Sequence, residues 1–259
     1  MMNYRWSGLV LWKPTQEHMA LERSILAELS SEEAFKHIRN ISQWVRTPGT
    51  DGELKACDYI KNTLTAYGVP VEVQDFEAYL SYPKEAHLRV VSPEQKSIDC
   101  LAHAFIASTP REGIEGELVD VGVGDREDYE KVDVRGKIVM IFTGGRLSDL
   151  EKFIIAERKG AIAQVHVNIG KADLNHTYQI KVVWGNPTPT TMNDLPRTPS
   201  VNIALGDGQY LQELCKKQRV HVWLNAKAWN GWKNVVQPVA QITGSCEPGR
   251  FVLAGAHYC

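Results

Sequence analysis

The stretch KIVMIFTGGRLSDLEKFIIAERKGAIAQVHV, residues 137–167, predicts a strand, a helix and a second strand in succession. Residues 137–142 are apolar after the first lysine, which is typical of a strand that is covered on both faces. A Gly-Gly pair interrupts this run, and Ser148 can cap the helix that follows. Gly160 ends that helix, and residues 161–167 form the next strand. Such a succession is a βαβ unit, so the chain is expected to have an α/β fold.

Two amphipathic helices are expected upstream of this unit. Ser30 and Glu33 have the spacing of a capping box, and apolar residues recur at helical spacing after them as far as Val45. Thr50 and a Glu three residues later repeat the spacing before a second helix, which Gly68 would end.

The remaining segments indicate short strands separated by Pro, Ser and Gly. The expected strands cover residues 71–79, 87–91, 97–101, 116–121, 200–205, 219–224, 234–243 and 250–256, with a short helix over 207–217. Breaks are expected after the first strand, at Tyr82-Pro83-Lys84, and within the aromatic segment that contains Trp229 and Trp232.

Composition restricts the class of protein. The chain has 259 residues, 43% of them hydrophobic, and 29 Lys and Arg against 31 Asp and Glu give a formal net charge of −2. These values exclude a disordered chain, a collagen and a coiled coil, and they argue against a nucleic-acid partner. The five cysteines form no zinc-finger pattern and predict free thiols in a reducing compartment. The N-terminal apolar segment is too short for a signal peptide or a membrane span, so a cytoplasmic protein without a membrane partner is expected.

Three blocks of sequence, in this order, resemble one known family. Residues 46–76 (RTPGTDGELKACDYIKNTLTAYGVPVEVQDF) resemble the opening of the co-catalytic zinc aminopeptidases, a group that includes the glutamate-carboxypeptidase-like enzymes. Residues 119–145 (VDVGVGDREDYEKVDVRGKIVMIFTGG) and 153–168 (FIIAERKGAIAQVHVN) look like a protease-associated (PA) domain, which many of these peptidases carry as an insert. Residues 234–259 (NVVQPVAQITGSCEPGRFVLAGAHYC) are similar to the return into the peptidase fold.

The resemblance implies a discontinuous layout. Residues 1–85 would be the N-terminal part of the peptidase domain, residues 86–226 the PA insert, and residues 227–259 the peptidase domain continued and truncated after the first metal-ligand strand. The implied fold is therefore α/β, the start of a mixed-sheet zinc-exopeptidase fold interrupted by a β-rich PA domain.

The resemblance also implies a site with two zinc ions. Its ligands are a His at the end of one strand and then Asp, Glu, Asp and His, while a second Glu acts as general base. Only His257 matches one of these positions, as the first metal ligand, and no catalytic residue carries over. The family has an Asp two residues after this His, where the chain has Cys259, which cannot accept the same charge-assisted hydrogen bond. The expected function is the N-terminal fragment of a zinc-dependent exopeptidase that acts on peptide substrates, inactive as this chain and unable to hold the two zinc ions alone.

Two other readings stay open: a non-catalytic PA-domain module that binds peptides or proteins, and a purely structural fragment. An unpaired strand at residues 250–256 would favour a dimer or aggregation.

Three further patterns have mainly structural interpretations. The segment Gly122-Val123-Gly124-Asp125 is expected to be a turn between strands rather than a phosphate-binding loop. Asp173 and His176 are expected to be a solvated pair in a loop. The side chains of Trp223, Trp229 and Trp232 are expected to pack at the domain junction, with a substrate-facing surface as the alternative.

Overall fold

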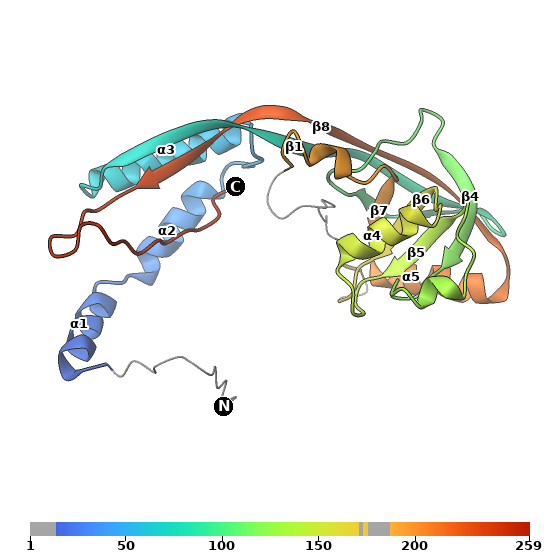
Figure 1. Cartoon of the computed structure of the whole chain (residues 1–259), viewed down its shortest axis with the longest axis horizontal. Coiled ribbons are helices and arrows are strands. Elements are labelled where there is room, and N and C mark those ends of the chain that lie inside the picture. Colours follow the sequence, from blue (N-terminus) through green and yellow to red (C-terminus); the bar gives the residue numbers. More distant parts are fainter. Residues whose placement is uncertain (1–13, 171–172, 176–186) are drawn as a thin grey trace. The chain divides into compact units, whose positions relative to one another are not determined.

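The computed structural model describes residues 14–170, 173–175 and 187–259. They form two compact units, which are described separately (Figure 1). Unit 1 comprises Met1–Glu72 and Pro238–Cys259, and unit 2 comprises Val73–Gln237. Among the helices that the structure describes, none has the length and apolar character needed to cross a lipid bilayer.

Three helices lie in the described part of unit 1: α1 (Gln16–Ala27), α2 (Ser31–Ile41) and α3 (Asp51–Ala66). The two helices predicted from the sequence are α2 and α3, whereas α1 was not predicted. The backbone amide of Glu33 donates to Ser30 Oγ at 3.2 Å, so Ser30 caps α2 as expected.

The end of α2 and the N-terminal cap of α3 differ from the prediction, whereas Gly68, with a φ of 79°, ends α3 as predicted. Helix α2 ends at Ile41 rather than Val45, and the Arg46 guanidinium donates to the Ile41 carbonyl at 2.8 Å. This bond satisfies a carbonyl that the helix end leaves without a helical partner. The Thr50 side chain does not cap α3, because its hydroxyl donates instead to the Thr47 carbonyl at 2.6 Å.

Unit 2 is built on an eight-stranded mixed sheet, and only the ends of its two longest strands extend into unit 1. The strands are β1 (Val71–Ser92), β2 (Lys96–Ile98), β3 (Cys100–Ala102), β4 (Ile114–Asp120), β5 (Ile138–Phe142), β6 (Ala163–Val167), β7 (Ser200–Ile203) and β8 (Val220–Ala240), in the spatial order β2-β1-β8-β4-β5-β6-β7-β3. The four central strands β4 to β7 are parallel, and β2, β3 and β8 pair antiparallel with β1, β7 and β4.

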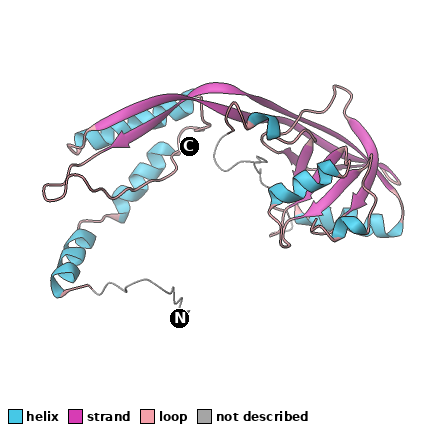
Figure 2. Ribbon diagram, in the orientation of Figure 1, coloured by secondary structure: helices cyan, strands magenta, loops and turns pink. Residues whose placement is uncertain are grey.

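Helices cover both faces of the parallel part of this sheet (Figure 2). Alternate residues of a strand point to opposite faces, and Met140 and Ile141 accordingly belong to different hydrophobic clusters. The Met140 cluster includes Leu211 of α5 (Leu205–Lys217), and the Ile141 cluster includes Ile155 of α4 (Asp149–Arg158). The short 3₁₀ helices are η1 (Asp128–Glu130) and η2 (Met192–Asp194).

The βαβ unit predicted over residues 137–167 is confirmed as β5, α4 and β6. Ser148 forms the predicted cap, as a full capping box with Glu151. Strands β5 and β6 are parallel and pair Ile138 with Ala163.

The breaks predicted within the two longest strands are wrong. Both β1 and β8 continue through the segments where the sequence indicated an interruption. Aromatic rings pair in these segments: Tyr82 stacks on Trp229 with ring centroids 5.0 Å apart, and Tyr79 meets Trp232 edge-on at 5.4 Å. Packing between distant aromatic side chains stabilises strands in this way, which outweighs the local effect of a proline.

The strand predicted over residues 250–256 is also wrong, since these residues have no regular secondary structure. Phe251, Val252 and Leu253 are 85%, 97% and 83% exposed. An extended segment becomes a strand only when a neighbour supplies backbone partners, and the structure describes no such neighbour here. Dimerisation through this segment therefore stays a prediction, without a preformed strand edge behind it.

The predicted domain boundaries fall inside continuous strands. Residues 85 and 86 lie within β1, and residues 226 and 227 lie within β8. The division into a peptidase part and a PA insert stays a prediction.

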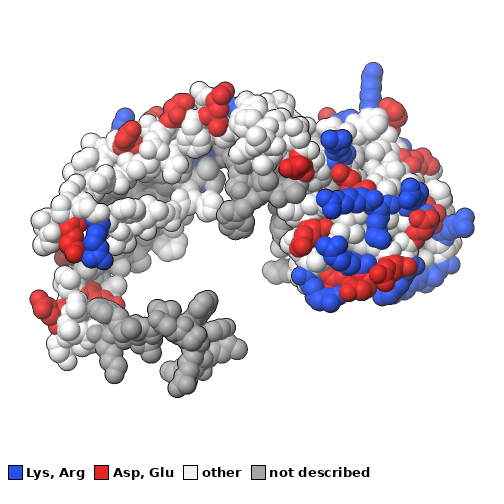
Figure 3. All heavy atoms as spheres, in the orientation of Figure 1, with Lys and Arg blue, Asp and Glu red and all other residues white. Residues whose placement is uncertain are grey.

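Charges of both signs are interspersed on unit 2. The face drawn in Figure 3 shows basic and acidic side chains next to one another. A nucleic-acid surface needs clustered Lys and Arg, and the absence of a nucleic-acid partner stays a prediction.

Replacing Gly208 by alanine will destabilise unit 2. Gly208 lies in α5, and an added Cβ would overlap the side chain of Val167 on β6, approaching its Cγ2 to 2.7 Å. Overpacking of this kind costs about 1–3 kcal/mol, which urea denaturation of Gly208→Ala will measure. Gly255→Ala is the matched control, because no atom lies within 4 Å of the added Cβ there. Equal stability of Gly208→Ala and the wild type would contradict the close packing of α5 on β6.

Candidate functional site

The predicted metal ligand His257 is exposed and lies in the irregular C-terminal segment of unit 1. The residue after it, Tyr258, lies close to α3. Burial, followed by the negative charges of Glu53 and Cys57, raises the pKa of the Tyr258 hydroxyl. The end of the segment is thus near the start of α3, whereas His257 itself is not at the end of a strand as predicted.

The residues that the structure describes do not form a zinc site. Within residues 14–170, 173–175 and 187–259, no group of three or more His, Cys, Asp or Glu side chains is placed to hold a metal ion. One imidazole cannot replace the three or four protein ligands that a zinc site requires. His257 is therefore not brought together with other ligands, and its role as a zinc ligand stays a prediction.

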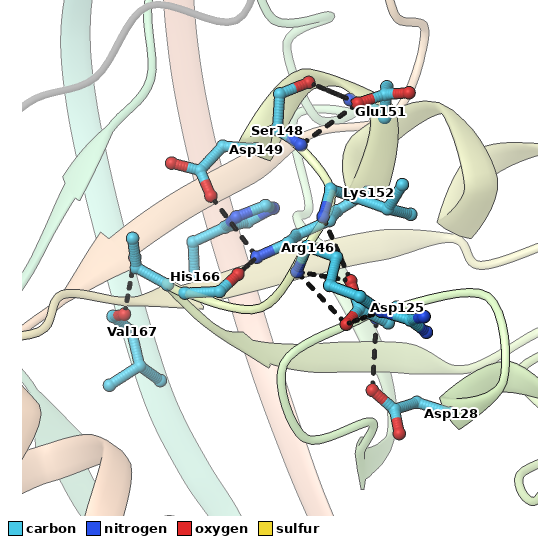
Figure 4. A network of polar contacts seen from close by, with 12 residues as sticks. Asp125, Asp128, Arg146, Ser148, Asp149, Glu151, Lys152, His166 and Val167 are labelled. Atoms are coloured by element: carbon cyan, nitrogen blue, oxygen red, sulfur yellow. Dashed lines mark hydrogen bonds and ion pairs between the residues drawn. The ribbon is translucent and has the colours of Figure 1, made fainter. Parts of the chain in front are cut away.

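Polar side chains are concentrated instead at the carboxyl ends of β4, β5 and β6 in unit 2 (Figure 4). Asp125 follows β4, and its carboxylate accepts hydrogen bonds from the backbone amides of Arg146 at 3.0 Å and Leu147 at 3.1 Å. Burial acts to raise the pKa of Asp125, but these bonds and the Arg146 guanidinium together lower it. The carboxylate thereby fixes the loop after β5. Gly122 and Gly124 have positive φ here, so the predicted turn between strands is confirmed.

Lys152 of α4 is the largest fully buried side chain with a charge in the described part of the chain. Its ammonium donates to the Gly144 carbonyl and lies 3.6 Å from Asp149 Oδ1 (Figure 4). Buried amines require such partners because leaving water is costly for a charge. Lys152 thus links α4 to the Gly-Gly turn that follows β5.

A second polar cluster lies on the face of β6 and β7 that α4 covers. Gln164 and His166 alternate with apolar residues, and His166 Nε2 contacts Gln164 Oε1 at 3.1 Å. The His166 ring stacks on Phe153 of α4, with centroids 5.5 Å apart, and meets the ring of His103 edge-on at 5.2 Å. His103 Nδ1 contacts Ser200 Oγ at 2.7 Å.

Both histidines of this cluster are neutral at neutral pH. Burial lowers the pKa of His103 to about 3. Burial, followed by electrostatic interactions with His103 and Lys152, lowers the pKa of His166 well below its usual range. Neither imidazole is exposed. These groups pair with one another and with Ser200 and Gln164, so the cluster stabilises the sheet and offers no accessible nucleophile or general base.

The sequence predicted the strand that carries Gln164 and His166 but not the role of its polar face. The signal was present, since two polar residues alternate with valines in a segment that is otherwise apolar. His103 and Lys152 carried no comparable signal. Of the other residues considered, Trp223 donates to the Glu112 carbonyl at 2.8 Å, Asp173 is exposed, and His176 lies outside the described residues.

The known proteins that this chain resembles in sequence or in structure are peptidases. No family model matches the chain. A probable glutamate carboxypeptidase, AMP1, from Arabidopsis thaliana is 24% identical over 159 residues, which cover 56% of this chain and 23% of that protein. An aminopeptidase from Aneurinibacillus sp. strain AM-1 has a similar structure, with a TM-score of 0.62, 25% identity and coverage of 84% of this chain and 49% of the other.

Two further solved structures share the fold. A peptidase M28 precursor from Shewanella amazonensis SB2B has a TM-score of 0.70 and 17% identity, covering 88% of this chain and 54% of the other. The zinc aminopeptidase BSAP from Bacillus subtilis has a TM-score of 0.58 and 23% identity, covering 81% and 47%. These likenesses support a relation to the co-catalytic zinc aminopeptidase-like family, and the chain shares its fold with the solved M28 peptidase precursor. It spans about half the length of these solved relatives and less of the curated one.

Proposed function

We propose that this chain supplies the N-terminal portion of a zinc-dependent exopeptidase of the aminopeptidase type. The observation that carries the proposal is the likeness to the Aneurinibacillus aminopeptidase, which has 25% identity and extends over 84% of this chain. The zinc aminopeptidase of Bacillus subtilis, with the same fold, supports zinc as the metal. Peptides with an accessible chain end are then the substrates.

The proposal gives different roles to residues 86–226 and to His257. Residues 86–226 form the PA insert, and the parallel strands β4 to β7 with α4 and α5 supply its core. His257 contributes one zinc ligand in the intact enzyme. Zinc would polarise the scissile carbonyl and activate water there. The remaining zinc ligands would be supplied by polypeptide outside the described residues.

The isolated 259-residue chain will neither retain zinc nor hydrolyse peptides. Because no set of ligands is assembled in the described residues, we expect well under one zinc ion per chain after dialysis. Elemental analysis by mass spectrometry and hydrolysis of amino-acid p-nitroanilides, with and without added zinc, will measure both quantities. The His257→Ala variant should behave like the parent chain. Two tightly bound zinc ions per chain, or hydrolysis that depends on zinc, would contradict this account.

Sequencing transcripts through and beyond codon 259 tests the relation to an intact enzyme. A continuing reading frame with a Gly-Ala-x-Asp-Asn-type segment and a Glu-Glu pair would support the peptidase proposal. A stop codon at the same place in independent copies would contradict it and favour the second function.

The second candidate function is a non-catalytic module that binds peptides. It is favoured by a surface groove on unit 2 that is lined by residues of β1 and of the edge strand β2. A binding function of this kind requires no metal ligands, so it can be tested separately from hydrolysis.

A further inference from the structure

Helix α2 of unit 1 contacts α3 through polar and aromatic side chains. The Tyr59 hydroxyl of α3 lies 2.8 Å from His37 Nδ1 and accepts a hydrogen bond from Asn40 Nδ2 at 2.9 Å. The centroid of the Trp44 ring, just beyond the end of α2, lies 6.3 Å from that of the Tyr59 ring. These contacts fix which side of α2 meets α3.

The apolar face of α2, formed by Ala34, Phe35 and Ile38, points away from α3. With 3.6 residues per turn, Phe35 and Ile38 lie close together on the side of the helix nearly opposite to the side that meets Tyr59. Phe35 and Ile38 are 57% and 58% exposed, and no residue of α2 is buried by the part of the chain that the structure describes. An amphipathic helix normally buries its apolar side, so this face requires a partner.

Two opposite charges border the apolar face of α2. Glu32 in the first turn and Arg39 in the last turn are seven residues apart, which is nearly two full turns, so both lie along the same margin of the face. Both are exposed, and neither forms an ion pair with another described residue. Glu33 and Lys36 pair with each other at 3.1 Å on the far side of the helix. The margin is thus negative at one end and positive at the other.

We propose that the apolar face of α2 packs on the same face of a second copy of this chain, with the two helices antiparallel about a twofold axis. Glu32 of each copy then lies beside Arg39 of the other, since a twofold interface repeats every contact. A parallel pair would bring like charges together, whereas the antiparallel pair also opposes the two helix dipoles. The charge order of the margin therefore selects α2 itself as its complement.

This inference is independent of both candidate functions. One helix face from each copy gives a small interface, so the dimer is expected to form reversibly. Analytical ultracentrifugation of the full chain at low salt should show the average mass rising from that of one chain towards that of two as the concentration is raised through the micromolar range. A monomer at every concentration would overturn the proposal and leave the apolar face of α2 to polypeptide outside the described residues.

Substitutions within the apolar face locate the contact. Phe35→Asp and Ile38→Asp are each expected to raise the dimer Kd at least about tenfold, because the interface would bury a carboxylate without a partner. Leu54→Asp is the matched control, since it replaces an apolar residue of α3 that is 47% exposed outside this face. Circular dichroism will verify that the variants are folded. A dimer that is unchanged in Phe35→Asp and Ile38→Asp would overturn the proposed face and indicate another contact, such as residues 250–256.

A charge exchange tests the antiparallel arrangement. Glu32→Arg or Arg39→Glu alone sets like charges opposite each other at both ends of the interface, so each should raise the Kd at least about fivefold. The double variant Glu32→Arg/Arg39→Glu restores both pairs with the signs exchanged and should associate like the wild type. Lys36→Glu, on the far side of α2, should have no effect on the Kd. A double variant that associates no better than the single ones would overturn the antiparallel pairing.

Discussion

Lowering the pH from 7 to 4.5 is expected to destabilise unit 2 by about 2.5 kcal/mol through His103 alone. Its pKa is about 3 in the folded protein, against about 6.5 in an unfolded chain. Below pH 6.5 the unfolded state binds a proton that the folded state does not, so stability is lost as the pH falls from 6.5 towards 3. The lowered pKa of His166 adds to the loss in the same direction. Hydrogen exchange of β6 and β7 in urea, measured at both pH values, will report the change in the free energy of unfolding.

The variant His103→Gln isolates this contribution. Glutamine can still contact Ser200 but does not titrate in this range, so the difference in stability between pH 7 and pH 4.5 should shrink by about 2.5 kcal/mol. The groups around the cluster are His166, Lys152 and, beyond Lys152, Asp149, all of which the variant keeps. The same loss of stability in the variant and in the wild type would show that His103 is not kept neutral by burial.

Replacing Lys152 by alanine is expected to destabilise unit 2 by about 3 kcal/mol. The side chain is fully buried, so the substitution leaves a cavity under α4 and removes the hydrogen bond to the Gly144 carbonyl. Methionine is the matched comparison, because it fills most of the volume without the ammonium group. Exchanging a buried charge for an apolar side chain of similar size often costs little, so Lys152→Met should lose less than about 1.5 kcal/mol.

Urea denaturation of the two Lys152 variants gives the free energies of unfolding, and hydrogen exchange of residues 143–148 reports the turn. We expect faster exchange there in both variants, since both lose the bond to Gly144. Equal destabilisation by alanine and methionine would show that the charge, not the volume of the side chain, dominates.

The local elements of the fold follow from sequence patterns. The continuous apolar run of β5 and the Ser148 cap of α4 act within a few residues, and the structure confirms both. Helix α5 is confirmed with an earlier start, at Leu205 rather than residue 207. The end of α2 and the N-terminal cap of α3 were less predictable, because Arg46 and Thr47 act there through the geometry of the connecting turn.

The candidate sites were predictable only in part. The resemblance singled out His257, but ligands meet in space through tertiary structure, and the described residues bring no partners to it. His103 and Ser200 meet across 97 positions of sequence, and Arg89 meets Trp223 on another strand. Neither pairing leaves a periodic pattern in the sequence.

Sequence patterns alone predict the α/β class, the βαβ unit at residues 137–167 and the resemblance to zinc aminopeptidases, because periodicity, capping and motif order can be read along the chain. Tertiary structure alone decided that β1 and β8 are continuous, that residues 250–256 are not a strand, and that Lys152, His103 and His166 are buried. The physical reason is the same in each case. Strand pairing and desolvation depend on groups that are distant in the chain, and only the folded arrangement brings those groups together.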